Sequence, residues 1–204
     1  PLRALPVDTV AVARHLAEAV RFRTISTNDA SASATPELDA LHRWMQLTYP
    51  KLHAALSREV IDRSSLLDTW NGSDPSLKPL LLMAHQDVVP VDPGTDAAWT
   101  HPPFDGTIAQ GTVWGRGAFD DKSALVGILE AMERMVASGV TPKRTVMLAF
   151  GHNEEVLGSG AAAIADTLER RGQLPALFPC WHAPTSELTS DPTLQSSITM
   201  YSTK

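Results

Sequence analysis

The chain has 204 residues, of which 43% are hydrophobic and 20% charged, so it is long enough for one domain and can bury a core. Its formal net charge of -6 argues against nucleic-acid binding and against docking on anionic lipid, because both need a basic face. A single cysteine, Cys180, excludes an intrachain disulfide and any metal site built from several cysteines.

The sequence shows neither a membrane segment nor a signal peptide. No run reaches the roughly 18 to 20 apolar residues that a membrane helix needs. The chain begins with Pro1 rather than Met, so we expect that it was cut at its N-terminus and that any targeting segment is out of view. We therefore make no prediction of its compartment.

In chain order, two helices are expected first, and three strands follow them. Apolar residues recur on one helical face over Asp8–Thr24, whose first residue can cap the helix, and over Glu37–Leu47. The strands are expected at Glu59–Asp62, Ser65–Trp70 and Leu80–Ala84. The last strand is a continuous apolar run, which is typical of a strand covered on both faces.

The second half of the chain begins with a predicted loop over residues 91–104, which are rich in Pro, Asp and Gly. A small hairpin is expected next, with Thr107–Ile108 paired to Thr112–Trp114. A helix, a buried strand and another helix are then predicted at Asp121–Ser138, Arg144–Phe150 and Ser159–Arg171.

This alternation of buried strands and amphipathic helices predicts an α/β fold. We expect a mixed, mainly parallel sheet with helices on both faces, formed by residues 1–172. Residues 173–204 differ from the rest, because they are rich in Pro, Ser and Thr and show no clear periodicity. We therefore expect a divergent, irregular tail there.

Three clusters of acidic and histidine residues follow strands or open a helix. They are His85-Gln86-Asp87, Asp120-Asp121 and Glu154-Glu155. Binding sites in open α/β sheets gather at the carboxyl ends of strands, where two of these clusters are predicted to lie. An imidazole with several carboxylates is a common set of metal ligands and suits zinc.

Each cluster also has a structural interpretation when it is taken alone. A histidine after a strand is more often hydrogen-bonded within the protein than bound to a metal, an aspartate pair can cap a helix, and a glutamate pair can be solvated. In the functional interpretation, one carboxylate of the Glu154-Glu155 pair binds metal while the other acts as a base. The two-residue offset lets Asp87 hold the imidazole of His85.

The residues that flank these clusters resemble one family. Four segments carry the resemblance: LLLMAHQDVVP at 80–90, Trp99 with PPFDG at 102–106, WGRGAFDDK at 114–122, and GHNEE at 151–155. Together they make residues from about 72 to 172 similar to the M20 family of metallopeptidases. The nearest branch holds carboxypeptidase S, Gly-Xaa carboxypeptidase and N-acyl-amino-acid hydrolases.

The resemblance implies a role for each residue of the predicted site. His85 corresponds to a ligand of one zinc ion, and Asp87 to the residue that orients it. Asp120 corresponds to the carboxylate that bridges two zinc ions, and Glu155 to a ligand of the second ion. Glu154 corresponds to the general base, which takes a proton from water and passes it to the leaving amine.

The implied reaction is the hydrolysis of an amide or peptide bond next to a free carboxylate, in a small peptide or an N-acyl amino acid. The resemblance also implies a cis peptide bond between Asp120 and Asp121. It predicts an M20-like catalytic domain that is incomplete, because the lid domain of the family and its late histidine ligand have no counterpart before Lys204.

Two departures from the family pattern stand out. Asn153 occupies a position where the family usually has Asp, so the charge beside the base is altered. Beyond Gly172 the expected strand and acidic zinc ligand are not recognisable, and the substitutes that the tail offers are His182, Glu187 and Asp191.

Two alternative functions stay open at this point. One is a non-catalytic, truncated remnant that folds but lacks a complete two-zinc site. Because only three metal ligands can be placed in the given sequence, the sequence alone leads us to expect little or no hydrolase activity. The other is a different metal hydrolase that uses the same acidic edge of the sheet.

Overall fold

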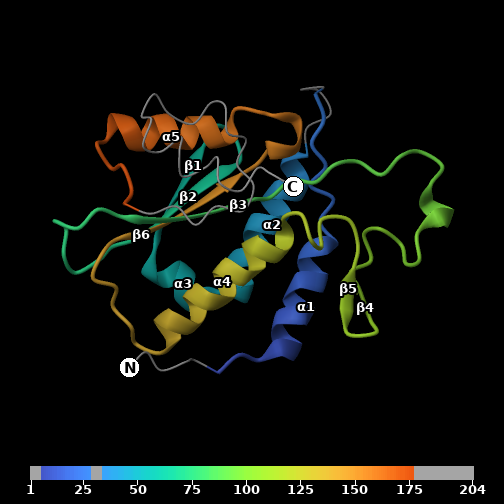
Figure 1. Cartoon of the computed structure of the whole chain (residues 1–204), viewed down its shortest axis with the longest axis horizontal. Coiled ribbons are helices and arrows are strands. Elements are labelled where there is room, and N and C mark those ends of the chain that lie inside the picture. Colours follow the sequence, from blue (N-terminus) through green and yellow to red (C-terminus); the bar gives the residue numbers. More distant parts are fainter. Residues whose placement is uncertain (1–5, 29–33, 177–204) are drawn as a thin grey trace.

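The predicted helices and strands are present in the computed structural model, which describes residues 6–28 and 34–176 (Figure 1). The helices are α1 (Thr9–Val20), α2 (Thr35–Thr48), α3 (Pro50–Ala55), α4 (Lys122–Ala137) and α5 (Gly160–Arg170). The strands are β1 (Ser57–Ile61), β2 (Ser65–Trp70), β3 (Leu80–His85), β4 (Thr107–Ala109), β5 (Thr112–Trp114) and β6 (Val146–Gly151). Two short 3-10 helices lie at Asp96–Ala98 and Glu154–Val156.

The helix boundaries agree with the sequence in part. Asp8 caps α1, because its carboxylate accepts hydrogen bonds from the backbone N–H groups of Val10 and Ala11. The helix ends at Val20, four residues before the predicted end. Helix α3 was not predicted, since its six residues are too few for an apolar period to show.

Four of the described strands form one sheet in the order β1-β2-β6-β3. Strands β3 and β6 are parallel, whereas β1 with β2 and β2 with β6 are antiparallel. A mixed sheet is therefore confirmed, but the expectation that it is mainly parallel is wrong for the described strands. The tight turn between β1 and β2, where Asp62 and Arg63 have positive φ, accounts for the first of the two antiparallel pairs, because a turn this short joins only antiparallel neighbours.

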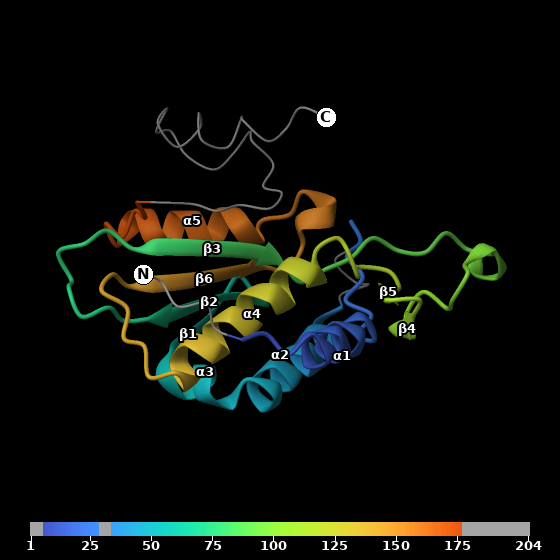
Figure 2. The same cartoon turned by 60° about the horizontal axis from the view of Figure 1, so that its bottom comes forward.

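Helices cover both faces of the sheet, as predicted (Figure 2). On one face, Leu148 of β6 belongs to a buried cluster with Leu129 of α4 and with residues of α2 and α3. On the other face, the neighbouring Met147 packs with Ile164 of α5. Successive residues of a strand point to opposite faces, so β6 is buried throughout and forms the centre of the core.

Helix α1 and the β4–β5 hairpin lie beside this sandwich and pack against each other. The loop that includes residues 90–106 extends outward next to the hairpin (Figure 1). None of the helices in the described ranges has the length and apolar character needed to cross a membrane. From residue 177 onward, the expected irregular tail lies outside the described residues.

Candidate metal centre

The carboxyl ends of β3 and β6 bring two of the three acidic clusters together. In the parallel pairing of these strands, His85 lies opposite Gly151, and the Gln86 backbone N–H donates to the Gly151 carbonyl at 2.9 Å. The chain after β3 carries Asp87, and the chain after β6 carries the pair at 154–155. The third cluster lies at the start of α4, which packs across β3.

His85, Asp120 and Glu155 converge at this edge of the sheet. One potential ligand atom from each lies within 4.8 Å of the others, and among the described residues no other group of three or more donors does so. The Nε2 atom of His85 lies 2.9 Å from Asp120 Oδ1 and 3.9 Å from Glu154 Oε2. Glu154 therefore lies directly beside the three converging residues.

Asp87 connects the carboxyl end of β3 to the segment that follows β6. Its carboxylate is fully buried and accepts hydrogen bonds from the backbone N–H groups of Glu154 at 3.0 Å and Glu155 at 3.1 Å. Its Oδ1 atom also lies 3.3 Å from Nδ1 of His85, and its carbonyl oxygen lies 3.0 Å from the same nitrogen. Asp87 thus contacts the histidine and also fixes the turn that carries both glutamates.

The excess of negative charge changes the pKa values of these groups. Burial alone would lower the pKa of His85, but the carboxylates of Asp87, Asp121 and Asp120 outweigh burial and raise it to about 10. Burial raises the pKa of Glu155, and the nearby carboxylates of Asp120 and Asp87 raise it further. The cluster therefore favours an added positive charge.

A divalent cation fits these residues. Ligand atoms that lie about 2.0 to 2.2 Å from one zinc ion are about 3.3 to 3.6 Å apart in a tetrahedral site, which small side-chain rotations would produce here. One imidazole and two carboxylates also leave a position open, as catalytic zinc sites do. A cation there would balance the carboxylates and let His85 bind as a neutral imidazole.

Two neighbouring residues, Asp121 and Lys122, make buried hydrogen bonds next to the centre that the spacing did not reveal. The buried carboxylate of Asp121 accepts a hydrogen bond from the His85 backbone N–H at 3.1 Å. Lys122 is fully buried and donates to the carbonyl groups of Ala19 and Phe22 at the end of α1. Only the DDK sequence at 120–122 indicated that these positions are special.

The two family-specific expectations have clear outcomes in the described part of the chain. The peptide bond between Asp120 and Asp121 is cis, as the resemblance implies. Asn153 uses its side-chain oxygen to accept a hydrogen bond from the Gly160 backbone N–H at 2.9 Å, at the start of α5. The proposed substitute ligands His182, Glu187 and Asp191 lie outside the described residues.

Comparison with known proteins agrees with this fold and site. Residues 81–195 match peptidase family M20/M25/M40, and the chain belongs to this family. The match continues beyond Gly172, so the family resemblance extends further than the motifs indicated. Membership of this family implies a divalent metal ion in the site.

Several relatives are similar over most of this chain. Carboxypeptidase S of Saccharomyces cerevisiae is 42% identical over 76% of the chain, which corresponds to 28% of that protein. The mouse N-fatty-acyl-amino acid synthase/hydrolase PM20D1 is 38% identical over 81% of the chain and 33% of its own length. The chain thus spans about a third of the length of these relatives.

Solved structures show the same fold. The M20 family metallo-carboxypeptidase Sso-CP2 from Sulfolobus solfataricus aligns with a TM-score of 0.62 at 24% identity, over 82% of this chain and 36% of that one. Human carnosine dipeptidase 1 aligns with a TM-score of 0.60 at 22% identity, over 78% of this chain and 35% of that one.

Proposed function

We propose that this chain carries the metal centre and the general base of a hydrolase that cleaves an amide or peptide bond next to a free carboxylate. The observation that supports this most is the convergence of His85, Asp120 and Glu155 beside Glu154. The substrate class, small peptides or N-acyl amino acids, comes from the relatives named as a carboxypeptidase and as an N-fatty-acyl-amino acid synthase/hydrolase.

The three converging residues hold zinc in this proposal. In the two-ion arrangement that the family resemblance implies, Asp120 would be the carboxylate shared by both ions, and His85 and Glu155 would each hold one of them. Bound zinc supplies a Lewis acid that lowers the pKa of water and polarises an amide carbonyl. Asp87 keeps His85 and the 154–155 turn in position through its buried carboxylate.

Glu154 moves the proton. Its carboxylate removes a proton from the attacking water and delivers it to the nitrogen of the leaving amine, which then departs as a neutral group. Its backbone is fixed by Asp87, while its side chain is partly exposed and can reach a substrate. A base must be held within hydrogen-bond reach of its proton, and this anchoring provides that position.

The test is an assay of the chain loaded with zinc against a panel of dipeptides and N-acyl amino acids. We expect bound zinc and turnover that the Glu154→Gln substitution abolishes without releasing the metal. Asp166→Asn, an exposed change on α5, serves as the matched control and should keep full activity. A chain that binds zinc but turns over no substrate faster than its Glu154→Gln variant would contradict the proposal and support the non-catalytic remnant.

A further inference from the structure

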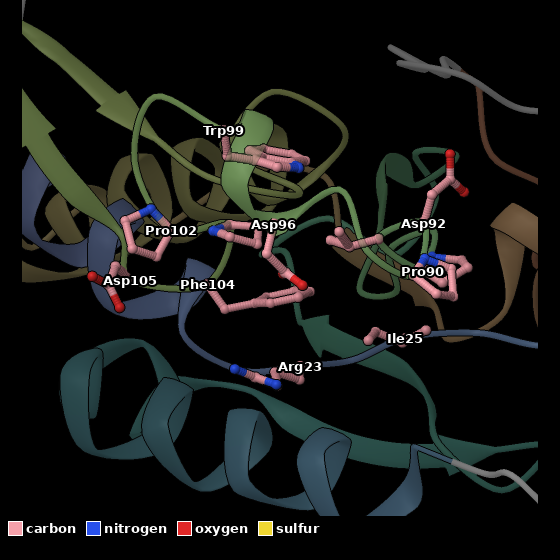
Figure 3. Close-up of a pocket in the computed structure, with 12 residues that line it drawn as sticks. Arg23, Ile25, Pro90, Asp92, Asp96, Trp99, Pro102, Phe104 and Asp105 are labelled. Carbon is pink, nitrogen blue, oxygen red and sulfur yellow. The ribbon is translucent and has the colours of Figure 1, made fainter.

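A second feature of the described surface is a pocket with a cavity volume of about 470 Å³ (Figure 3). Apolar and polar groups contribute nearly equal parts of its lining, with Ile25, Pro90, Trp99 and Phe104 among the apolar residues. In Figure 3, Trp99 and Phe104 lie on one side of the pocket, and Pro90 lies on the other. The three residues of the converging metal centre are not among those that line it.

The pocket lies next to the metal centre along the chain. Pro90 follows His85 by only five residues, so an extended chain could separate them by no more than about 18 Å. Ile25, another lining residue, pairs with Val88, which lies between His85 and Pro90 in the chain. The opposite wall is tied to the loop before Asp120, because the Pro103 carbonyl accepts a hydrogen bond from the Arg116 N–H at 2.6 Å.

The aromatic rings of the pocket region already contact positive charges of the protein itself. The guanidinium of Arg23 lies over the ring of Phe104, 4.9 Å from its centre. The guanidinium of Arg116 lies over Trp99 at 5.2 Å. These contacts show that the ring faces in this region bind cations, and that Arg23 and Arg116 of the protein already occupy one face of each ring.

Negative charge predominates on the rim of the pocket. Asp92, Asp96 and Asp105 line it and are exposed, whereas Arg23 is the positively charged residue among the lining side chains. A pocket lined by both apolar and acidic residues is complementary to a lysine or arginine side chain, whose methylene stem is apolar and whose end is cationic. A hydrocarbon chain would match the wall but would leave the carboxylates without a partner.

We propose that this pocket binds a lysine or arginine side chain of a peptide substrate. The proposal rests on the function proposed above and defines the substrate class further, as basic peptides rather than N-fatty-acyl amino acids. A peptide extends about 3.3 to 3.6 Å per residue, so the basic residue lies within about five residues of the scissile bond.

The test measures peptide binding by calorimetry to the zinc-loaded Glu154→Gln chain, in which hydrolysis is blocked. The probes are a pentapeptide with lysine at its second position, the same peptide with glutamate there, and N-decanoyl-alanine. We expect the lysine peptide to bind about tenfold more tightly than the glutamate peptide. The difference should shrink at high salt, because exposed charges are screened.

Two triple variants show whether the pocket causes this preference. Asp92→Asn/Asp96→Asn/Asp105→Asn should weaken binding of the lysine peptide about tenfold and leave the glutamate peptide unchanged or bound more tightly. The control Asp39→Asn/Asp166→Asn/Glu169→Gln removes as many exposed charges elsewhere and should change neither affinity.

Equal affinity for the two pentapeptides would overturn the proposal, as would tighter binding of N-decanoyl-alanine than of the lysine peptide. An equal loss in both triple variants would also overturn it, because the effect would then come from overall charge. Charge-dependent binding in a chain that turns over no substrate would support the pocket while contradicting the proposed hydrolase activity, so the two failures are distinguishable.

Discussion

Asp87 holds the segment that carries Glu154 and Glu155 through hydrogen bonds that cross 67 and 68 positions of the sequence. Its carboxylate is fully buried, and contact with His85 and with the Glu155 N–H holds its pKa below the ordinary value although burial opposes this. It therefore stays ionised while it holds both sides of the centre.

Substituting Asp87 by Asn tests this role. The amide offers one acceptor oxygen in place of two, so either Glu154 or Glu155 loses the partner of its backbone N–H. We expect zinc affinity to fall by about 10- to 100-fold, as is typical when a group that supports a metal ligand is changed. Zinc titration of the folded variant measures this, and an unchanged affinity would show that Asp87 does not position the ligands.

At the level of single residues, the chemistry could be predicted from the sequence only where side chains carry it. His85, Asp120 and Glu155 could be found because ligand-type side chains follow strands or open a helix, and because the flanking motifs resemble a family. The partners of Asp87 in the 154–155 turn could not be found, since they are backbone N–H groups that any residue offers.

Among the elements, β6 and α4 pack against each other and carry residues of the candidate site at their ends. Leu148 of β6 is fully buried in the cluster between the sheet and α4. Replacing it with alanine should lower the free energy of unfolding by about 2 to 5 kcal/mol, because a cavity remains in the core. Leu47→Ala on α2, at a side chain that is 82% exposed, should change it by less than about 0.5 kcal/mol. Equal effects in urea unfolding would contradict this packing.

Helix α2 contributes a histidine that makes the fold sensitive to acid. Burial lowers the pKa of His42, whose ring contacts the side chain of Gln86 just after β3. The unfolded chain therefore binds this proton at a higher pH than the folded chain, so stability is fully present above about pH 6.5 and declines as the pH falls below that value.

Urea unfolding between pH 7.5 and 5 checks this effect. His85, whose pKa is raised, adds stability as the pH falls and opposes the effect of His42. His42→Gln, which keeps an amide next to Gln86, should therefore be more stable at pH 5 relative to pH 7.5 than the wild type is. Burial also lowers the pKa of His53 and His152, so part of the pH dependence should persist. The same pH dependence in the variant and the wild type would show that His42 does not contribute.

Apolar spacing was enough to predict α1, α4 and α5, because each of these helices buries one face. The direction of the strands could not be predicted in this way, since β2 pairs with β6 across a sequence separation of about 80 residues. A buried strand is apolar on both faces whichever way its neighbours run. The antiparallel pairing of β2 with β6 therefore emerged only from the three-dimensional structure.

At the scale of the whole molecule, β3, β6 and α4 bring together residues that are 35 and 70 positions apart in the chain. Binding of zinc to this arrangement alone would stabilise the fold, because the unfolded chain separates the three ligands. The account therefore depends on one claim, that His85, Asp120 and Glu155 bind the metal together.

Zinc titration by calorimetry, on the wild type and on His85→Gln, Asp120→Asn and Glu155→Gln, tests this claim most directly. We expect at least one zinc ion per wild-type chain, at least a tenfold loss of affinity in each of the three variants, and no change in Asp166→Asn. Circular dichroism of each variant confirms that it is folded. Folded variants that bind zinc with the stoichiometry and affinity of the wild type would contradict the account.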